Sequence, residues 1–121
     1  MKPLLHSHLP TFLQRFNAFK ESEFRSLEIV SATSIKLTYA LQDEAKEFDW
    51  ITLTLLFDGV SDAKLLESNK MTFTNMEDGI SLFYEDTKFF FGNGIIKKGD
   101  SITDASYFIV AKTIKFEEGQ F

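Results

Sequence analysis

One stretch near the middle of the chain, residues 48–62, constrains the fold more than any other. Its sequence is FDWITLTLLFDGVSD, in which apolar residues occupy every second position from Ile51 to Phe57. Successive side chains of a β-strand point to opposite faces, so this alternation predicts a strand with one apolar face. The opposite face, with Thr52, Thr54 and Leu56, has mixed character, as expected of a central strand. Asp58 and Gly59 then end the strand as turn residues.

Strands with similar alternation are expected on both sides of this stretch. Residues 24–31 and 34–42 form two strands joined by Ala32 and Thr33, and a charged loop at residues 43–47 leads into the central strand. Three successive strands with short links predict an antiparallel meander. The remaining expected features are short strands at 71–74, 80–84 and 88–91, a turn at 85–87, a break or bulge at 92–94, a solvated turn at 97–100, and a last strand at 105–116 with a bend at Lys112-Thr113.

One amphipathic helix is expected before the strands, at residues 10–20. Leu9, Phe12 and Phe16 recur there at helical spacing, which is typical of a helix that covers a sheet. Residues 1–8 are expected to form a loose leader, and residues 61–69 a short helix capped by Ser61. The sequence therefore predicts a single domain, 1–121, with a helix at 10–20 and a β-rich body at 24–116.

The predicted fold class is α+β and mostly β. We expect a twisted antiparallel sheet in meander order, with the N-terminal helix packed on it. Curling of that sheet into a barrel or a sandwich is the alternative, because twisted sheets with many strands tend to curl.

The composition excludes several kinds of protein. The absence of cysteine removes disulfides, thiolate catalysis and zinc sites built on cysteine. The net charge of −5 argues against nucleic-acid binding, which depends on lysine and arginine meeting phosphates. No apolar run approaches the ~20 residues that span a bilayer, and the first ten residues lack the apolar core of a secretory signal. We therefore expect a cytoplasmic protein without a nucleic-acid or membrane partner.

No motif points to catalysis, a cofactor or a metal. His6 and His8 are the only histidines, and no third ligand stands at a fixed spacing from them. The acidic pairs stand beside turn residues, where carboxylates usually bond the local backbone. Trp50 and the tyrosines are expected to be core or half-buried. We predict no enzyme; a carboxylate-based hydrolase, which needs two converging acidic groups with a raised pKa, is an alternative.

Two surfaces are candidates for interaction. Phe83 and Phe90 oppose the inward residues of the hairpin at 80–91, so both faces of that hairpin are apolar. The second face requires a cover, which is the helix, a second sheet or another chain, and a homodimer would bury both rings against their copies. The acidic loop with Asp43, Glu44 and Glu47 would instead meet a basic protein partner through fast, salt-sensitive association.

Three phrases of the sequence carry a resemblance: FRSLEIVSATSIKLTY (24–39), FDWITLTLLFDGVSDAKLL (48–66) and GISLFYEDTKFFFGNG (79–94). Their strand patterning and Asp-Gly turns resemble compact β-rich proteins grouped with the immunity proteins of bacterial polymorphic-toxin systems. The resemblance covers most of the chain after residue 23 and implies a non-enzymatic protein that binds and neutralises a partner. A small-ligand-binding β domain, with phenylalanines lining a cavity, is another alternative. The sequence leaves the partner, the ligand and the oligomeric state open.

Overall fold

The computed structural model describes residues 1–96 and 101–121, and the solvated turn predicted at 97–100 lies outside the described residues. The elements in chain order are β1 (Lys2–Pro3), the short 3-10 helix η1 (His6–His8), α1 (Leu9–Arg15), η2 (Asn17–Phe19), β2 (Glu23–Ser31), β3 (Ser34–Asp43), η3 (Glu44–Lys46), β4 (Asp49–Asp58), β5 (Asp62–Lys64), α2 (Ser68–Met71), β6 (Ile80–Glu85), β7 (Lys88–Asn93), η4 (Ile102–Asp104), β8 (Phe108–Ala111) and β9 (Thr113–Gln120). None of the described helices has the length and apolar character that crossing a membrane requires.

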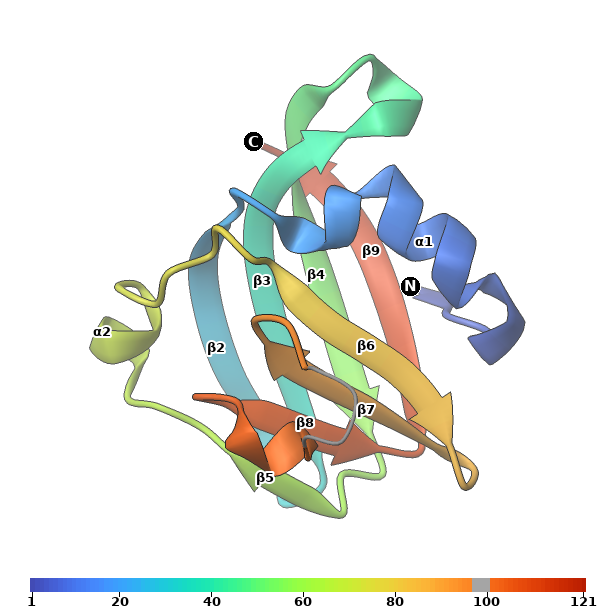
Figure 1. Cartoon of the computed structure of the whole chain (residues 1–121), viewed down its shortest axis with the longest axis vertical. Helices are drawn as coiled ribbons and strands as arrows, with labels where there is room; N and C mark the ends of the chain where they lie inside the picture. Colours follow the sequence, from blue (N-terminus) through green and yellow to red (C-terminus); the bar gives the residue numbers. More distant parts are fainter. Residues whose placement is uncertain (97–100) are drawn as a thin grey trace.

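The strands form two antiparallel sheets. A five-stranded sheet has the order β1-β9-β4-β3-β2, and a four-stranded sheet has the order β5-β8-β7-β6. The four-stranded sheet crosses in front of the lower part of the five-stranded sheet, while α1 and η2 lie across its upper part (Figure 1). The predicted fold class is confirmed: the protein is mostly β and antiparallel, with a helix at its N-terminus. Within the described residues the sheets face each other as layers and do not close into a barrel.

The central position predicted for residues 48–62 is confirmed by β4. This strand pairs along its length with β3 on one side and with β9 on the other. Its inward residues are buried, with Leu53, Leu55 and Phe57 fully so. The Phe57 ring lies 5.0 Å from the Phe91 ring of β7, measured between centroids. The two sheets therefore share one core, and burial of such side chains is its main stabilising term.

The predicted bend near the end of the chain is where the chain changes sheets. Only Lys112 separates β8, in the four-stranded sheet, from β9, in the five-stranded sheet. The backbone N–H of Lys112 donates to the carbonyl of Asp58, at 3.1 Å. The single strand predicted at 105–116 is thus two strands, each contributing to a different layer.

The N-terminal helix ends earlier than predicted. Its regular part stops at Arg15, and Asn17, Ala18 and Phe19 all adopt positive φ values of 51°, 51° and 62°. Phe19 is fully buried, with its ring 5.2 Å from the Tyr39 ring. The chain leaves the helical path here, and this departure places the Phe19 ring in the core against β3.

Three local predictions are wrong. Residues 1–8 are not a loose leader, since β1 pairs with β9 and Leu4 is buried. Ser61 does not cap a helix; its N–H donates to the carbonyl of Val110 at 2.9 Å, and β5 then pairs with β8. No strand forms at 71–74, because α2 ends there with Met71 buried in the core. In each case a sheet edge or the core offers partners that local sequence does not reveal.

Candidate functional site

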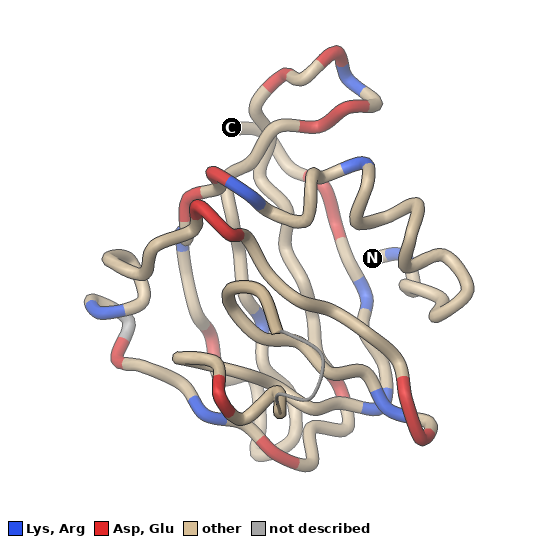
Figure 2. The backbone as a smooth tube through the Cα atoms, in the orientation of Figure 1, with Lys and Arg blue, Asp and Glu red and all other residues tan. Residues whose placement is uncertain are grey.

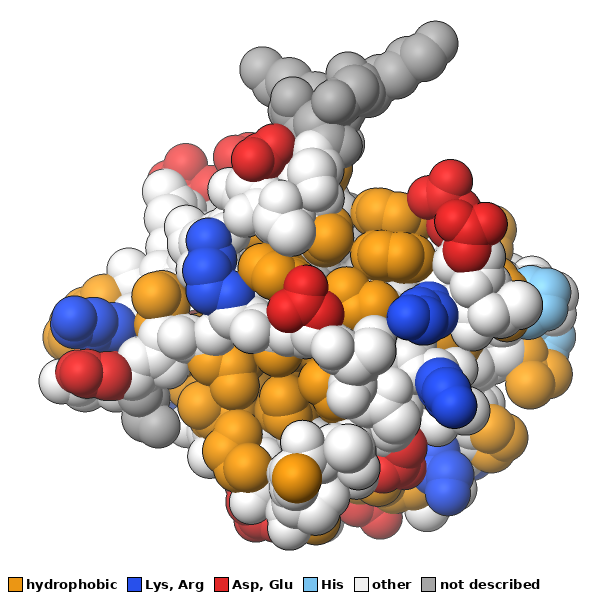
Figure 3. Space-filling model, turned by 90° about the horizontal axis from the view of Figure 1, so that it is seen from below, with side chains coloured by type: hydrophobic (Ala, Val, Ile, Leu, Met, Phe, Trp, Pro, Cys, Tyr) orange, Lys and Arg blue, Asp and Glu red, His pale blue; other side chains and the backbone are white. Residues whose placement is uncertain are grey.

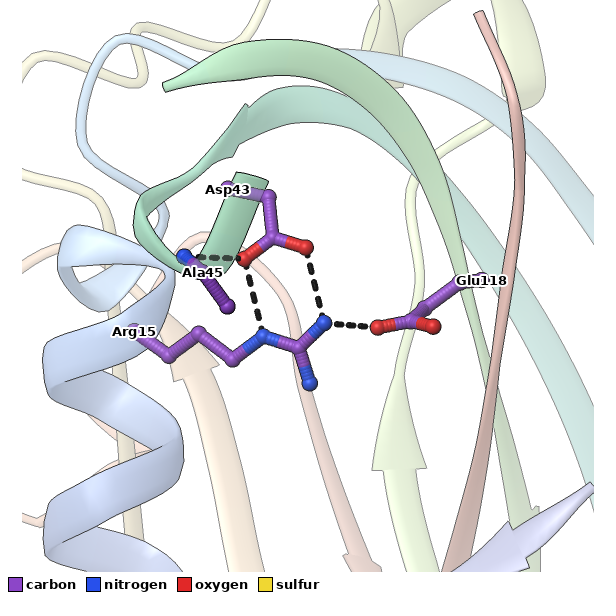
Figure 4. Close-up of polar contacts among 4 residues, drawn as sticks. All are labelled: Arg15, Asp43, Ala45 and Glu118. Carbon is purple, nitrogen blue, oxygen red and sulfur yellow. Dashed lines mark hydrogen bonds and ion pairs between the residues drawn. The ribbon is translucent and has the colours of Figure 1, made fainter. Parts of the chain in front are cut away.

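An ion-pair cluster lies where β3 ends and the loop to β4 begins, a point that we call the hairpin base (Figure 4). The Nε and Nη2 groups of Arg15 donate to Asp43 Oδ1 and Oδ2 at 2.8 and 2.7 Å. The same Nη2 also donates to Glu118 Oε1, and the backbone N–H of Ala45 donates to Asp43 Oδ1 at 2.9 Å. The Asp43 side chain is fully buried, while those of Arg15 and Glu118 are 26% and 25% exposed. Both Asp43 oxygens therefore have partners, and a bidentate pair of this kind fixes geometry as well as charge.

This cluster joins α1, the end of β3 and the end of β9. Asp43 was expected on the exposed acidic loop with Glu44 and Glu47, and that expectation is wrong: the carboxylate points inward to Arg15. Glu44 and Glu47 are exposed, as expected. The sequence did not predict that Arg15 and Glu118 belong to this site. Arg15 lies 28 residues before Asp43, and Glu118 lies 103 residues after Arg15. No rule of sequence spacing links positions so far apart.

Beyond this base, the hairpin projects from the body of the molecule (Figure 1). Phe48 and Trp50 are 60% and 40% exposed, and nearby Phe121 is 66% exposed. Trp50 is thus more exposed than predicted. Acidic positions lie around the end of the hairpin (Figure 2), and Lys46 lies among them. We define the acidic–aromatic tip as the set Glu44, Glu47, Phe48, Asp49, Trp50 and Phe121.

The backbone of the tip is held in an unusual conformation. Glu47 and Phe48 have φ values of 55° and 65°, a region that residues with a side chain adopt uncommonly. The N–H of Phe48 donates to the carbonyl of Asp43 at 2.9 Å, and the Gln42 side-chain amide donates to the carbonyl of Phe48 at 3.2 Å. These bonds fix the backbone at Phe48, whose side chain is 60% exposed.

Phe83 and Phe90 lie on the outer face of the four-stranded sheet, as predicted from the alternation. They are directly paired in the ladder, and their rings are stacked with centroids 5.1 Å apart. Both are half-buried against a second apolar cluster made by Ile96, Ile102, Ala105, Phe108 and Val110. Hydrophobic side chains remain visible at this end of the molecule (Figure 3). The chain's own η4 thus supplies part of the cover that this face requires.

The predicted candidates for chemistry stand apart from one another. The His6 ring stacks on Tyr84, with centroids 4.4 Å apart. Asp58 accepts from the Ser34 hydroxyl, and Asp104 accepts from the backbone N–H of Ser101 in a capping box. In the described part of the chain, no three histidine, aspartate or glutamate side chains gather as a metal site requires. Asp43 and Glu118 do approach each other, but Arg15 lies between them.

Two tyrosine hydroxyls meet in the core between the sheets. Tyr39 of β3 and Tyr107, just before β8, are joined by a hydrogen bond of 2.7 Å. Burial raises the pKa of Tyr107 to about 12, although the hydrogen bond with Tyr39 partly offsets this. Burial also raises the pKa of Tyr39, and the neighbouring Tyr107 adds to the rise. Both side chains are fully buried and adopt their neutral forms.

This pair predicts a loss of stability at alkaline pH. The unfolded chain releases tyrosine protons near pH 10, whereas the folded protein holds them to higher pH. The contribution is therefore complete below about pH 10 and is lost as the pH rises toward about 12. Urea unfolding from about pH 8 to about pH 11 should show this decline in the wild type. The decline should be smaller in the Tyr39→Phe/Tyr107→Phe variant, and equal pH dependence in both proteins would contradict it.

One open groove lies between β1, α1 and β9. It has a volume of about 490 Å³, and its apolar lining includes Leu4, Phe12 and Phe116. Lys2 and Arg15 also line it. Phenylalanines therefore line a hollow, as the small-ligand alternative requires.

Comparison with protein-family models, with curated proteins and with solved structures finds no match to this chain. The function has to be inferred from the arrangement of its own residues.

Proposed function

We propose that this chain is a non-enzymatic protein-binding module that works through the acidic–aromatic tip. The observation that carries the proposal is the exposure of Phe48 and Trp50 where the β3–β4 loop enters β4, with the exposed Phe121 ring against Trp50. Large aromatic side chains supply much of the energy of protein interfaces, and leaving several of them in water is unfavourable without a partner. Partner neutralisation, the role implied by the resemblance to immunity proteins, is the form of binding that we propose.

The charge of the tip defines the kind of partner. Glu44, Glu47 and Asp49 are exposed there, with Lys46 as the only lysine between them. The whole chain carries a net charge of −5. A basic protein surface would complement this charge, and the association should be fast and sensitive to salt.

The rigidity of the hairpin base supports the same proposal. Arg15 holds both oxygens of Asp43, and Asp43 in turn accepts from the N–H of Ala45. The loop that carries the tip is therefore anchored at Asp43, where it leaves β3. A surface that is already ordered before binding loses less conformational entropy when the partner arrives, so its affinity is higher.

A small-ligand-binding domain is the second candidate, because Phe12 and Phe116 line the groove of about 490 Å³. Its volume falls within the usual range for ligand pockets. Self-association through Phe83 and Phe90 stays a prediction, as does the carboxylate-based hydrolase. For the hydrolase, the two carboxylates that approach each other share Arg15 instead of facing a common cavity.

Amide NMR with a defined basic probe tests the proposal. The probe is an acetylated peptide in which lysine alternates with glycine. We expect its shift changes to concentrate at residues 44–50. A Glu44→Gln/Glu47→Gln variant should bind about fivefold more weakly at low salt, since two exposed charge pairs of about 0.5 kcal/mol each sum to about 1 kcal/mol.

The matched control is Glu85→Gln/Asp86→Asn in the β6–β7 turn, which removes the same charge from a different exposed turn. The control should bind the peptide nearly as well as the wild type does. Equal weakening in the two variants, or shift changes centred on residues 85–86, would contradict the proposal.

A further inference from the structure

A pocket opens beside the acidic–aromatic tip, where the start of β4 meets the end of β9. It has a volume of about 400 Å³ and is lined by Asp49, Trp50, Glu118 and Phe121, with Lys46 also at its wall. The Trp50 and Phe121 rings lie 5.6 Å apart between centroids. The pocket thus combines two aromatic rings with two carboxylates.

The aromatic surface at this pocket already holds a cation from its own chain. The guanidinium carbon of Arg25, on β2, lies 5.0 Å from the centroid of the Phe121 ring. That distance is within the range of a cation–π interaction. Arg25 is also paired with Glu23 at 3.2 Å, so its charge is balanced nearby. The contact indicates that this aromatic surface accommodates a planar guanidinium.

The two carboxylates of the pocket differ in whether they already have an ion-pair partner. Glu118 is engaged with Arg15. Asp49 is exposed and, among the described residues, has no ion-pair partner. Asp49 is therefore the free acceptor of the pocket. Lys46 carries the one positive charge in the lining, where no ion pair joins it to Asp49.

We propose that this pocket binds one arginine side chain of the protein partner. The inference rests on the proposed function and specifies the contact that anchors the partner. Arginine fits better than lysine because its planar guanidinium stacks on aromatic rings and can donate two parallel hydrogen bonds to one carboxylate. Trp50 and Phe121 supply the rings, and Asp49 supplies the carboxylate.

Fluorescence provides a direct test, because Trp50 is the only tryptophan in the chain. The probe is an acetylated pentapeptide with one central arginine flanked by glycines. Its counterpart carries citrulline, which has nearly the same shape without the charge. We expect the arginine peptide to change Trp50 emission, and the citrulline peptide to bind about fivefold more weakly, as loss of a cation–π contact and a charge pair implies.

Variants with matched controls assign the binding to the pocket. Phe121→Leu and Asp49→Asn should each weaken binding of the arginine peptide about threefold, while keeping Trp50 as reporter. Phe73→Leu and Asp62→Asn change an exposed phenylalanine and an exposed aspartate elsewhere, and should leave binding unchanged. Equal binding of the arginine and citrulline peptides, or equal loss in the control variants, would overturn the inference.

The two proposals can fail separately. If the lysine peptide still shifts residues 44–50 but the arginine peptide leaves Trp50 emission unchanged, the arginine pocket is wrong and the binding tip stands. If neither peptide acts at this end of the molecule, both proposals are wrong.

Discussion

Replacing Arg15 with alanine is expected to lower the free energy of unfolding by about 3 kcal/mol. The change leaves the Asp43 carboxylate fully buried with only the Ala45 N–H as a partner. An unpaired buried charge is costly because the interior solvates it poorly. Arg15 is itself 26% exposed, so water would reach the gap in part, and we place the loss at the low end of the range for buried pairs.

The matched control for this prediction is Arg25→Ala. Arg25 also forms an ion pair, with Glu23 at 3.2 Å, but the two side chains are 43% and 61% exposed. Exposed pairs contribute less than about 1 kcal/mol, so the control should be close to the wild type. Urea unfolding at neutral pH measures both variants. Equal losses in the two would show that the Arg15–Asp43 pair has no special role at the hairpin base.

The second large effect is expected at Gly79, which directly precedes β6. Its φ is +67°, and a Cβ atom placed there would lie 2.0 Å from the carbonyl oxygen of Ala18. Gly79→Ala therefore forces apart η2 and the start of β6, in addition to the strain of a positive φ. We expect a loss of about 3 kcal/mol or more, the sum of overpacking and backbone strain.

Gly94→Ala separates these two causes. Gly94 also has a positive φ, +80°, but a Cβ there would meet no atom within 4 Å. This control should lose only about 1–2 kcal/mol, the cost of the backbone conformation alone. If Gly79→Ala and Gly94→Ala unfold at the same urea concentration, the close approach of η2 to β6 does not contribute to stability.

Much of the sheet could be predicted because its signals are local. The alternation from Ile51 to Phe57 located β4 and its inward face, and the two-residue link at Ala32-Thr33 located the β2–β3 hairpin. The bend at Lys112 was also predicted. Side-chain alternation and short links depend only on neighbouring residues.

The N-terminal and middle segments could not be predicted because distant partners decide them. Lys2 and Pro3 pair with the other end of the chain, and residue 61 joins β8 through a backbone hydrogen bond. The possible cap and the helical spacing at 61–69 favoured a helix. The edge of β8 instead offered backbone hydrogen-bond partners, and β5 paired with it. Local propensity is a weak guide wherever tertiary pairing competes with it.

The candidate site was predicted only in part. The acidic loop was identified, but the inward turn of Asp43 depends on Arg15 from a different element. Exposure of Trp50 was missed because alternation tells which face a residue occupies and not whether another layer covers that face. Phe121 gave no signal, since nothing in the sequence relates it to Trp50 before β4 and β9 are known to pair.

Protein capture with matched baits tests the central claim, that the acidic–aromatic tip is a protein-binding surface, most directly. Three baits are compared in extracts of the source cells: the wild type, Glu44→Gln/Glu47→Gln, and Glu85→Gln/Asp86→Asn. We predict that a basic protein is retained by the wild type and by the β6–β7 turn variant but is lost from the tip variant. Retention of the same proteins by all three baits would contradict the claim.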